Sequence, residues 1–348
     1  MAVDWVSKDG LAVGKGATVQ EFVATVGGRK FEMDVAPWGE GHVKVNGQEI
    51  AHVTSAKDRR QAFRELKSLA ERYMAGQGLI PQSKRKSSMI PVVKAKLLEG
   101  KKGLIVGIAN ENSIAWGCAK AFRAFGSELA VTYLNEKAKK YVEPLARELE
   151  APILMPLDVS KPGEMEAVFE RITKDWGKLD FLVHSIAFSP KDALQGRVVD
   201  VSREGFLTTM DVSCWTFIRM AHLAEPLMPN GGTLFTMTYY GSQMVVENYN
   251  IMGVAKAALE SAVRYLAAEL GPKGIRVHAV SPGPLATRAA SGIPEFDALL
   301  DKAKTKAPAR RLVSIDDVGA ATAFLAHDAA RLITGETLYI DGGYHIID

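Results

Sequence analysis

Seven short apolar runs, separated by segments with helical periodicity, constrain the fold of this chain more than any other feature. In order they read KGLIVGIA, ELAVTYL, PILMPLDV, DFLVHSIAF, GTLFTMTYY, IRVHAVSPG and TLYIDGG, all after residue 92. Segments such as MEAVFERITKDW and AALESAVRYLAAEL lie between most of them. Nearly continuous apolar strands that alternate with helices indicate a parallel sheet covered on both faces. The sequence therefore predicts a doubly wound, Rossmann-like α/β fold, in which ligands bind beyond the carboxyl ends of the strands.

The residues before this domain have a different pattern. The run VQEFVATVGGRKFEMDVA alternates apolar and polar residues around Gly27-Gly28, and HVKVNGQEIAHV does so around Asn46-Gly47, as β-hairpins do. A helix is expected next, with Ser55 as its N-cap. Its apolar stripe consists of Phe63, Leu66, Ala70 and Tyr73. We expect a small unit of β-hairpins and one helix.

Three parts follow from these patterns. Residues 1–75 form the small accessory unit, and residues 93–348 form the doubly wound domain. Residues 76–92 are rich in Gly, Pro, Ser and Lys, which is typical of a linker. Met89 could start a shorter chain that contains the large domain alone. The basic helix and the Lys84–Lys86 run could contact RNA, but a solvated helix face and a soluble linker are the simpler interpretation.

The composition excludes several classes of protein. A net charge of +3 does not by itself imply a nucleic-acid or membrane partner. Cys118 and Cys214 are too far apart for a C-x-x-C site, and no H-x-x-x-H pattern occurs, so neither a disulfide framework nor a metal is expected. No apolar run reaches the roughly 18 residues of a membrane span. We expect a cytoplasmic protein.

The first apolar run ends in GIANENSIAWG, Gly107–Gly117, where a glycine opens a turn into a helix. Such a turn directs backbone N–H groups and a helix N-terminus at a pyrophosphate. The segment is not a G-x-G-x-x-G motif, and many loops between a strand and a helix begin with glycine. On the pattern alone it is either a phosphate-binding turn or an ordinary connection.

The second and third runs end in TYLNEK and LDV, where the adenosine of a dinucleotide would lie. A 2′-phosphate is usually met by an Arg, whereas a free 2′-OH accepts acidic or neutral neighbours. Leu134, Asn135 and Glu136 place no cation at the nearest positions, which favours NADH, although Lys137 follows. Asp158 could hold the adenine amino group or cap the next helix.

The fourth run is followed by HSIAF. Its small residues Ser185 and Ala187 would let a flat cofactor pass close to the chain. His184 has no evident acidic partner or nucleophile, so we interpret it as a packed residue and not a catalytic one.

The segment ENYNIMGVAK, Glu247–Lys256, separates a tyrosine and a lysine by seven positions. Two helical turns of 3.6 residues bring Tyr249 and Lys256 to nearly the same face. A phenol near an ammonium could form a proton-donor pair. A solvated helix face that carries one aromatic residue has the same spacing, and spacing alone favours that interpretation.

Six motifs together decide between these interpretations. NSIAWG, LDV, HSIAF, MTYYGS, NYNIMGVAKAALE and SPGPLATRAASGI have the order and spacing found in the enoyl-acyl-carrier-protein reductases, which the chain resembles from about Leu97 to Asp348. This family is a divergent branch of the short-chain dehydrogenase/reductases and closes each elongation cycle of bacterial fatty acid synthesis. The motif that distinguishes this family is Tyr-x6-Lys, whereas ordinary members of the superfamily have Tyr-x3-Lys. Four positions before Lys256 stands Met252, which cannot donate a phenolic proton.

The resemblance implies an NADH-dependent homotetramer that reduces enoyl chains carried by acyl carrier protein. Within it Tyr249 donates a hydrogen bond to the thioester oxygen, Lys256 binds the nicotinamide ribose, and Tyr239 has a supporting catalytic role. The implied cofactor-binding residues are Gly107, Ser113, Ile114, Leu134, Asp158, Val159, Ser185, Ile186, Ala187, Lys256, Leu285, Ala286, Thr287, Arg288 and Ala289. The implied substrate-binding residues are Ser189, Tyr239 and Met252.

One motif departs from the family's pattern. The family often reads I-R-T-L-A where this chain has L-A-T-R-A, Leu285–Ala289. Because Arg288 is displaced, the residue that it would pair with is not determined by the resemblance. Thr287 matches and would contact the pyrophosphate through its hydroxyl. Gly283 and Gly292 bracket the segment and could serve as hinges of a mobile cover.

Two alternatives stay open at this point. One is a ketoreductase or another alcohol dehydrogenase of the same superfamily. The other is a non-catalytic binding protein on a reductase scaffold that uses residues 1–88 to hold nucleic acid. The intact Tyr249–Lys256 pair argues against the second alternative.

Overall fold

The structure is a computed structural model that describes residues 6–13, 17–26, 29–36, 40–54, 59–76, 96–285, 287 and 296–347. The chain divides into two compact units, Met1–Ser88 and Met89–Asp348. The predicted linker lies outside the described residues apart from Gly76, as do Gly27-Gly28 and Ser55.

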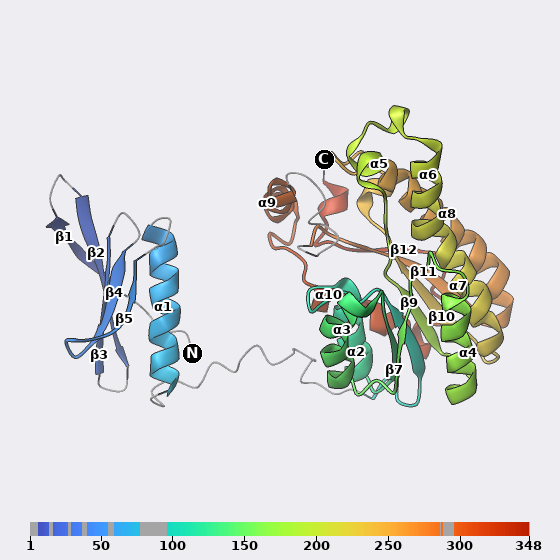
Figure 1. Ribbon diagram of the computed structural model, residues 1–348, viewed down its shortest axis with the longest axis horizontal. Coiled ribbons are helices and arrows are strands. Elements are labelled where there is room, and N and C mark those ends of the chain that lie inside the picture. Colours follow the sequence, from blue (N-terminus) through green and yellow to red (C-terminus); the bar gives the residue numbers. More distant parts are fainter. Residues whose placement is uncertain are drawn as a thin grey trace. The chain divides into compact units, whose positions relative to one another are not determined.

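The small unit is a five-stranded antiparallel sheet with one helix packed against it (Figure 1). In sheet order the strands are β1 (Val6–Val13), β2 (Ala17–Val26), β3 (Arg29–Val35), β4 (Gly41–Val45) and β5 (Gln48–Val53), and α1 (Arg59–Gly76) follows. The predicted turn is confirmed, because Asn46 and Gly47 join β4 to β5 with φ angles of 49° and 85°. Strands β3 and β4 turn every second side chain into the core.

The apolar stripe of α1 completes this small core. Its buried members are Ala62, Leu66, Ala70 and Met74. Phe63 and Tyr73, the other two residues of the predicted stripe, are half-buried and pack against this core. The predicted strands-plus-helix unit is confirmed in its architecture.

The large unit contains a seven-stranded parallel sheet of order β12-β11-β10-β9-β6-β7-β8. The strands are β6 (Lys102–Val106), β7 (Glu128–Tyr133), β8 (Ile153–Pro156), β9 (Phe181–His184), β10 (Gly232–Met237), β11 (Ile275–Pro282) and β12 (Thr337–Ile340). They coincide with the seven predicted apolar runs, and the predicted doubly wound fold is confirmed. The strand order reverses between β6 and β9, and ligands of such sheets bind at the carboxyl ends of the strands at this point.

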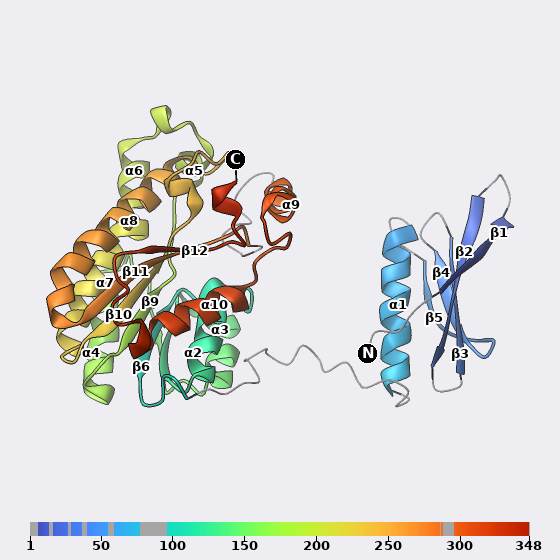
Figure 2. The ribbon, with the colours of Figure 1, turned by 180° about the vertical axis from the view of Figure 1, so that it is seen from behind.

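Helices cover both faces of this sheet (Figures 1 and 2). One core contains α4 (Glu164–Trp176), α7 (Thr216–Ala224) and α8 (Asn250–Leu270), and the other contains α2 (Ile114–Ala124), α3 (Glu136–Glu148) and α10 (Ile315–Leu325). Neighbouring strand residues point to opposite cores, as Leu104 and Ile105 do. Further helices are α5 (Lys191–Gln195), α6 (Arg203–Met210), a π-helix (Asp211–Trp215) and α9 (Phe296–Lys306).

Helices α2 and α10 approach each other closely because each carries a glycine at the contact. A Cβ atom on Gly117 would lie 2.1 Å from the Ile315 carbonyl oxygen, and one on Gly319 would lie 2.1 Å from the Gly117 oxygen. The contact leaves no room for a larger residue. It fixes the position of α2, which begins at the predicted phosphate turn.

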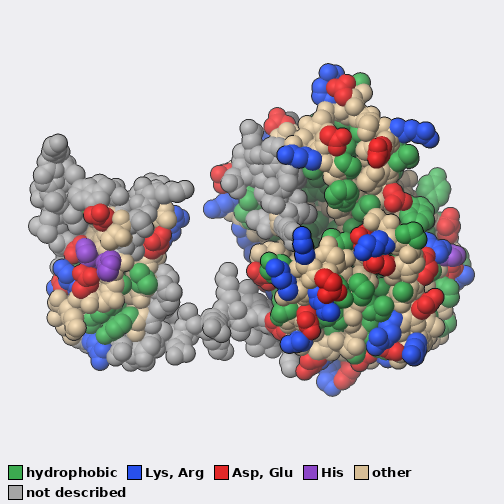
Figure 3. All heavy atoms as spheres, viewed as in Figure 1, with side chains coloured by type: hydrophobic (Ala, Val, Ile, Leu, Met, Phe, Trp, Pro, Cys, Tyr) green, Lys and Arg blue, Asp and Glu red, His purple; other side chains and the backbone are tan. Residues whose placement is uncertain are grey.

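Charged side chains of both signs are interspersed over the surface in Figure 3. On the small unit, Lys44 pairs with Asp34 (3.7 Å), and Glu49 pairs with His42 (2.9 Å) and His52 (3.3 Å). Lys44 and Asp34 thus offset one another on neighbouring strands, and the Glu49 carboxylate lies against two imidazoles. No helix in the described part of the chain is long and apolar enough to cross a membrane.

Candidate active site

The turn after β6 meets the end of β9 where the strand order reverses. Gly107 has a φ of 108°, and a Cβ atom there would lie 2.1 Å from the Ser185 carbonyl oxygen, so only glycine fits. The Ser113 hydroxyl oxygen accepts hydrogen bonds from the N–H groups of Ala109 (3.0 Å) and Asn110 (3.1 Å), which shapes the turn. Helix α2 begins with the next residue, Ile114. The predicted phosphate-binding residues of this turn therefore lie where the strand order reverses.

The predicted adenosine-binding residues follow β7 and β8. Leu134 is 53% exposed, and Asn135 caps α3 by accepting a backbone N–H. The Asp158 carboxylate accepts hydrogen bonds from the N–H (3.1 Å) and hydroxyl (2.6 Å) of Ser160. The alternative role of Asp158 as the N-cap of the next helix is wrong, because Gly163 is the N-cap of α4. Contact of Asp158 with adenine stays a prediction.

The end of β9 carries a structural histidine, and the predicted cofactor-binding residues follow it. His184 is fully buried, with its ring nitrogens 2.9 Å from the Thr236 hydroxyl and 3.0 Å from the Thr216 hydroxyl. Burial lowers the pKa of His184 to about 3, so the ring is neutral and packed, as we interpreted it. Val159 and Ile186 are half-buried and pack against the core that contains α4, α7 and α8, and Ala187 is exposed.

Tyr249 precedes helix α8 and is not within it, which differs from our expectation from the spacing. The helix begins at Asn250, and Tyr249 is its N-cap. On either side of Tyr249, Asn248 (φ 62°) and Asn250 (φ 43°) are left-handed, a conformation that Asn tolerates better than most residues. The Asn250 amide donates to the Leu194 carbonyl (2.8 Å) and thereby ties this turn to α5.

A buried tyrosine, Tyr249, and a half-buried one, Tyr239, face each other at the carboxyl edge of the sheet. Tyr239, just after β10, has its ring centroid 5.0 Å from that of Tyr249, at an interplanar angle of 70°. Burial raises the pKa of both phenols, so both are protonated at neutral pH. The Tyr239 hydroxyl has no hydrogen-bond partner among the described residues. An unpaired buried hydroxyl costs about 1–3 kcal/mol, which a ligand oxygen would remove.

Lys256 places a buried ammonium at the same edge. It is 4% exposed, and its Nζ donates to the Met237 carbonyl oxygen at 2.7 Å. Burial lowers the pKa of Lys256 to about 8, against the opposing influence of Cys214 and Glu260. An ammonium has three N–H groups, so this contact leaves two for the hydroxyls of a sugar.

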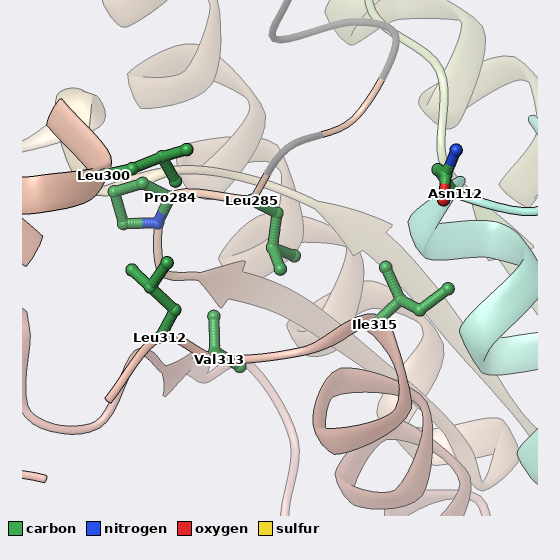
Figure 4. A pocket seen from close by; sticks show the side chains of 7 residues that line it. All are labelled: Asn112, Pro284, Leu285, Leu300, Leu312, Val313 and Ile315. Atoms are coloured by element: carbon green, nitrogen blue, oxygen red, sulfur yellow. The ribbon is translucent and has the colours of Figure 1, made fainter. Parts of the chain in front are cut away.

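An apolar pocket of about 240 Å³ opens between the turn before α2 and the segment after β11 (Figure 4). It is lined by Asn112, Pro284, Leu285, Leu300, Leu312, Val313 and Ile315. Leu285 was predicted to contact the cofactor, and the Thr287 N–H donates to its carbonyl (2.8 Å). Ala286, Arg288, Ala289 and Gly292 lie outside the described residues, so their predicted roles stay predictions.

The predicted substrate-binding residues come from three places: Ser189 before α5, Tyr239 after β10 and Met252 in α8. Met252 is buried in a small cluster with Tyr249 and Tyr239. The Ser189 hydroxyl lies 2.8 Å from the Thr209 hydroxyl. Ser213, in the π-helix, bonds both the N–H and the carbonyl of residue 188 at 3.0 Å and so fixes this segment.

From the sequence patterns we expected neither the π-helix nor the buried Glu260. A π-helix adds one residue to a turn, and no local pattern marked it within a continuous helical stretch. Glu260 did leave a signal, because it is a charged residue on the apolar side of the AKAALE segment.

The fold and these side chains define a class of protein. A tyrosine and a lysine at the carboxyl edge of a doubly wound sheet are the arrangement expected of a short-chain dehydrogenase/reductase. The sequence family described as Enoyl-(Acyl carrier protein) reductase matches residues 107–345. The chain belongs to this family, and the predicted resemblance is confirmed.

Relatives and solved structures agree with this assignment. Enoyl-[acyl-carrier-protein] reductase [NADH] 2 of Rhizobium meliloti is 50% identical over 250 residues, which cover 72% of this chain and 93% of that protein. The NADH enoyl reductase FabI of Rickettsia conorii is 44% identical over 251 residues, covering 72% and 96%. The Anaplasma phagocytophilum enzyme, solved with NAD, has a TM-score of 0.70 at 50% identity, covering 73% of this chain and 97% of its own. The Bacillus cereus enzyme, solved with NADP+ and an indole naphthyridinone, has a TM-score of 0.71 at 42% identity, covering 72% and 99%.

The buried lysine predicts a pH dependence of stability. Its pKa is about 8 in the folded state and near 10.5 when exposed, so between these values the unfolded chain binds the extra proton. The free energy of unfolding contributed by Lys256 should therefore rise with pH in this window, by up to about 1.4 kcal/mol per pH unit. Denaturant unfolding gives the free energy of unfolding of the wild type and of Lys256→Met at each pH. The difference between the two proteins removes the contributions of other groups. A difference that stays flat from pH 8 to 10.5 would contradict the lowered pKa.

Proposed function

We propose that this chain is an NADH-dependent enoyl-acyl-carrier-protein reductase of bacterial type II fatty acid synthesis. The observation that carries the proposal is the convergence of two phenols, Tyr239 and Tyr249, and one buried ammonium, Lys256, at the carboxyl edge of the sheet. Named NADH enoyl reductases that share 42–50% of their sequence with this chain support it.

The chain's own residues fit a nicotinamide dinucleotide. At Gly107 the backbone is free of a Cβ atom, and α2 begins seven residues further on, where N–H groups can meet a pyrophosphate. Lys256 has two N–H groups left for the nicotinamide ribose. No group of His, Cys, Asp and Glu in the described part of the chain could hold a metal ion. When bound, NADH supplies the hydride that reaches the β-carbon of the trans-2-enoyl thioester.

Tyr249 acts on the charge that the substrate develops. Hydride addition to the β-carbon moves negative charge to the thioester oxygen, which becomes an enolate oxygen. A donor aimed at that oxygen stabilises the transition state by about 3–4 kcal/mol. Because burial raises the pKa of Tyr249, the phenol keeps its proton and serves as this donor. A proton added to the α-carbon completes the reduction.

Lys256 and Tyr239 support that step. The Lys256 ammonium holds the nicotinamide ribose, and its charge favours electron-rich oxygen nearby. Tyr239 packs edge-to-face on Tyr249 and keeps its ring in place, and its unpaired hydroxyl supplies a second donor beside the thioester. Met252 lines the pocket next to both rings.

The same site predicts the effect of removing one oxygen atom. We expect Tyr249→Phe to lower kcat for crotonyl thioester about 100- to 1,000-fold, because the enolate oxygen loses its donor, while NADH affinity is preserved. Tyr141→Phe, at a half-exposed tyrosine of α3, is the matched control and should be fully active. The assay follows the oxidation of NADH and of NADPH in parallel. Wild-type protein that ignores crotonyl thioester but reduces acetoacetyl thioester would instead be a ketoreductase.

We also propose that the enzyme works as a homotetramer in the cytoplasm, where the family's acyl carrier protein substrate is elongated. Large exposed apolar side chains on the large unit support assembly: Trp215, Val254, Tyr265, Phe324 and Leu332. Light scattering should give four times the chain mass of 37.7 kDa. A monomeric mass at micromolar concentration would refute the tetramer.

Residues 1–75 are, in this proposal, an accessory unit joined by linker 76–92 to the reductase domain, 93–348. Every proposed catalytic residue lies in the large unit, which supports this division. A chain that starts at Met89 should therefore keep kcat/KM within about twofold of the full chain. Loss of activity with an intact fold, or salt-sensitive RNA binding by the full chain, would show that the small unit has a larger role.

A further inference from the structure

One buried carboxylate beside the proposed catalytic residues has no part in the mechanism above. Glu260 lies on α8 and is 5% exposed. A carboxylate is rarely buried unless hydrogen bonds or an opposite charge compensate for the lost water. Its contacts therefore indicate what it is for.

Glu260 fastens the turn that carries Tyr239. Its Oε1 atom accepts hydrogen bonds from the Thr238 hydroxyl (2.7 Å) and the Ser242 hydroxyl (2.6 Å). Two short bonds to one oxygen are the pattern of an ionised carboxylate. These bonds hold both ends of the Thr238–Ser242 turn to α8. Tyr239 lies between them, and its own hydroxyl has no partner among the described residues, so the turn determines where its ring stands.

Glu260 also lies one helical turn from Lys256, at the i, i+4 spacing that places side chains on the same face. Burial favours the neutral form of Lys256, and the charge of Glu260 favours the ammonium form. Other ionisable groups near the ammonium are Cys214 in the π-helix and His184 on β9. Burial raises the pKa of Cys214 and lowers that of His184, so both are uncharged at neutral pH.

We propose that Glu260 is a positioning residue of the reductase site: its carboxylate holds the Thr238–Ser242 turn, and with it Tyr239, against Tyr249, and keeps Lys256 in its charged form. The activity part of this inference rests on the proposed function. The hydrogen bonds of Glu260 to the turn do not depend on the proposed function. Glu260 acts through its neighbours and touches neither substrate nor cofactor.

Glu260→Gln tests the charge and leaves the hydrogen bonds in place, because the Gln carbonyl oxygen can accept from both hydroxyls. Lys256 binds the ribose in its charged form, which exists below its pKa. Without the carboxylate that pKa falls further, so NADH binding should weaken at a pH about one unit lower than in the wild type. At about pH 8 the KM for NADH should rise about fivefold with little change in kcat. An unchanged pH dependence would overturn the charge role.

The matched control is Glu269→Gln, the same substitution at an exposed position of the same helix. We expect its pH dependence of NADH binding to equal that of the wild type. NADH fluorescence titrations supply this readout without any turnover.

Thr238→Val tests the anchor and leaves the charge in place. It removes one of the two bonds to Glu260 with little change in shape, and should lower kcat about tenfold without shifting the pH dependence. Amide hydrogen exchange of residues 238–242 in the free protein should become faster. Thr173→Val is the control, at a hydroxyl that bonds within α4. Unchanged kcat and unchanged exchange would overturn the anchoring role.

These measurements separate the two proposals. Wild-type protein that binds NADH but does not reduce crotonyl thioester would refute the proposed reaction. The NADH titrations and the amide exchange would still decide whether Glu260 controls Lys256 and the turn.

Discussion

A parallel sheet must be covered on both faces, and this constraint organises the large unit. Helices α2 and α3, which follow β6 and β7, cover one face, and α4, α7 and α8 cover the other, with the strand order reversing once, between β6 and β9. At that reversal the turn after β6 runs against the end of β9 so closely that Gly107 can carry no side chain. Tyr239 lies after β10, the strand next to β9, and thus at the same edge. The fold therefore supplies the crevice before any catalytic residue is considered.

Burial then sets the chemistry of the side chains at this edge. The same loss of water raises the pKa of two phenols and lowers that of Lys256, so the phenols keep their protons and the lysine is held close to losing its own. The Met237 carbonyl and the Glu260 carboxylate compensate the ammonium in part. Burial of a lysine lowers the free energy of unfolding, because its ammonium is better solvated in the unfolded chain. The two well-packed cores of the large unit offset this loss.

Much of the architecture could be predicted from local pattern. All seven parallel strands were visible as apolar runs, and the Asn46-Gly47 turn was visible from its two residue types. The predicted family was visible because its motifs occur in a fixed order. Two expectations were wrong at the level of single residues. Helix α8 begins after Tyr249, and Gly163, not Asp158, caps α4. In both cases the helix start depends on the conformation of a preceding turn, which periodicity does not describe.

By itself, the sequence determined the order of strands and helices, the doubly wound class and the identity of the tyrosine and lysine, because these depend on residue type and on spacing along the chain. Only the tertiary structure decided that Tyr239 meets Tyr249 edge-to-face, that Lys256 donates to Met237, and that Glu260 accepts from Thr238 and Ser242. The partners in these contacts are 10 to 22 residues apart, as with the 22 between Thr238 and Glu260. Burial and hydrogen bonding act through space, and distance along the chain does not encode them.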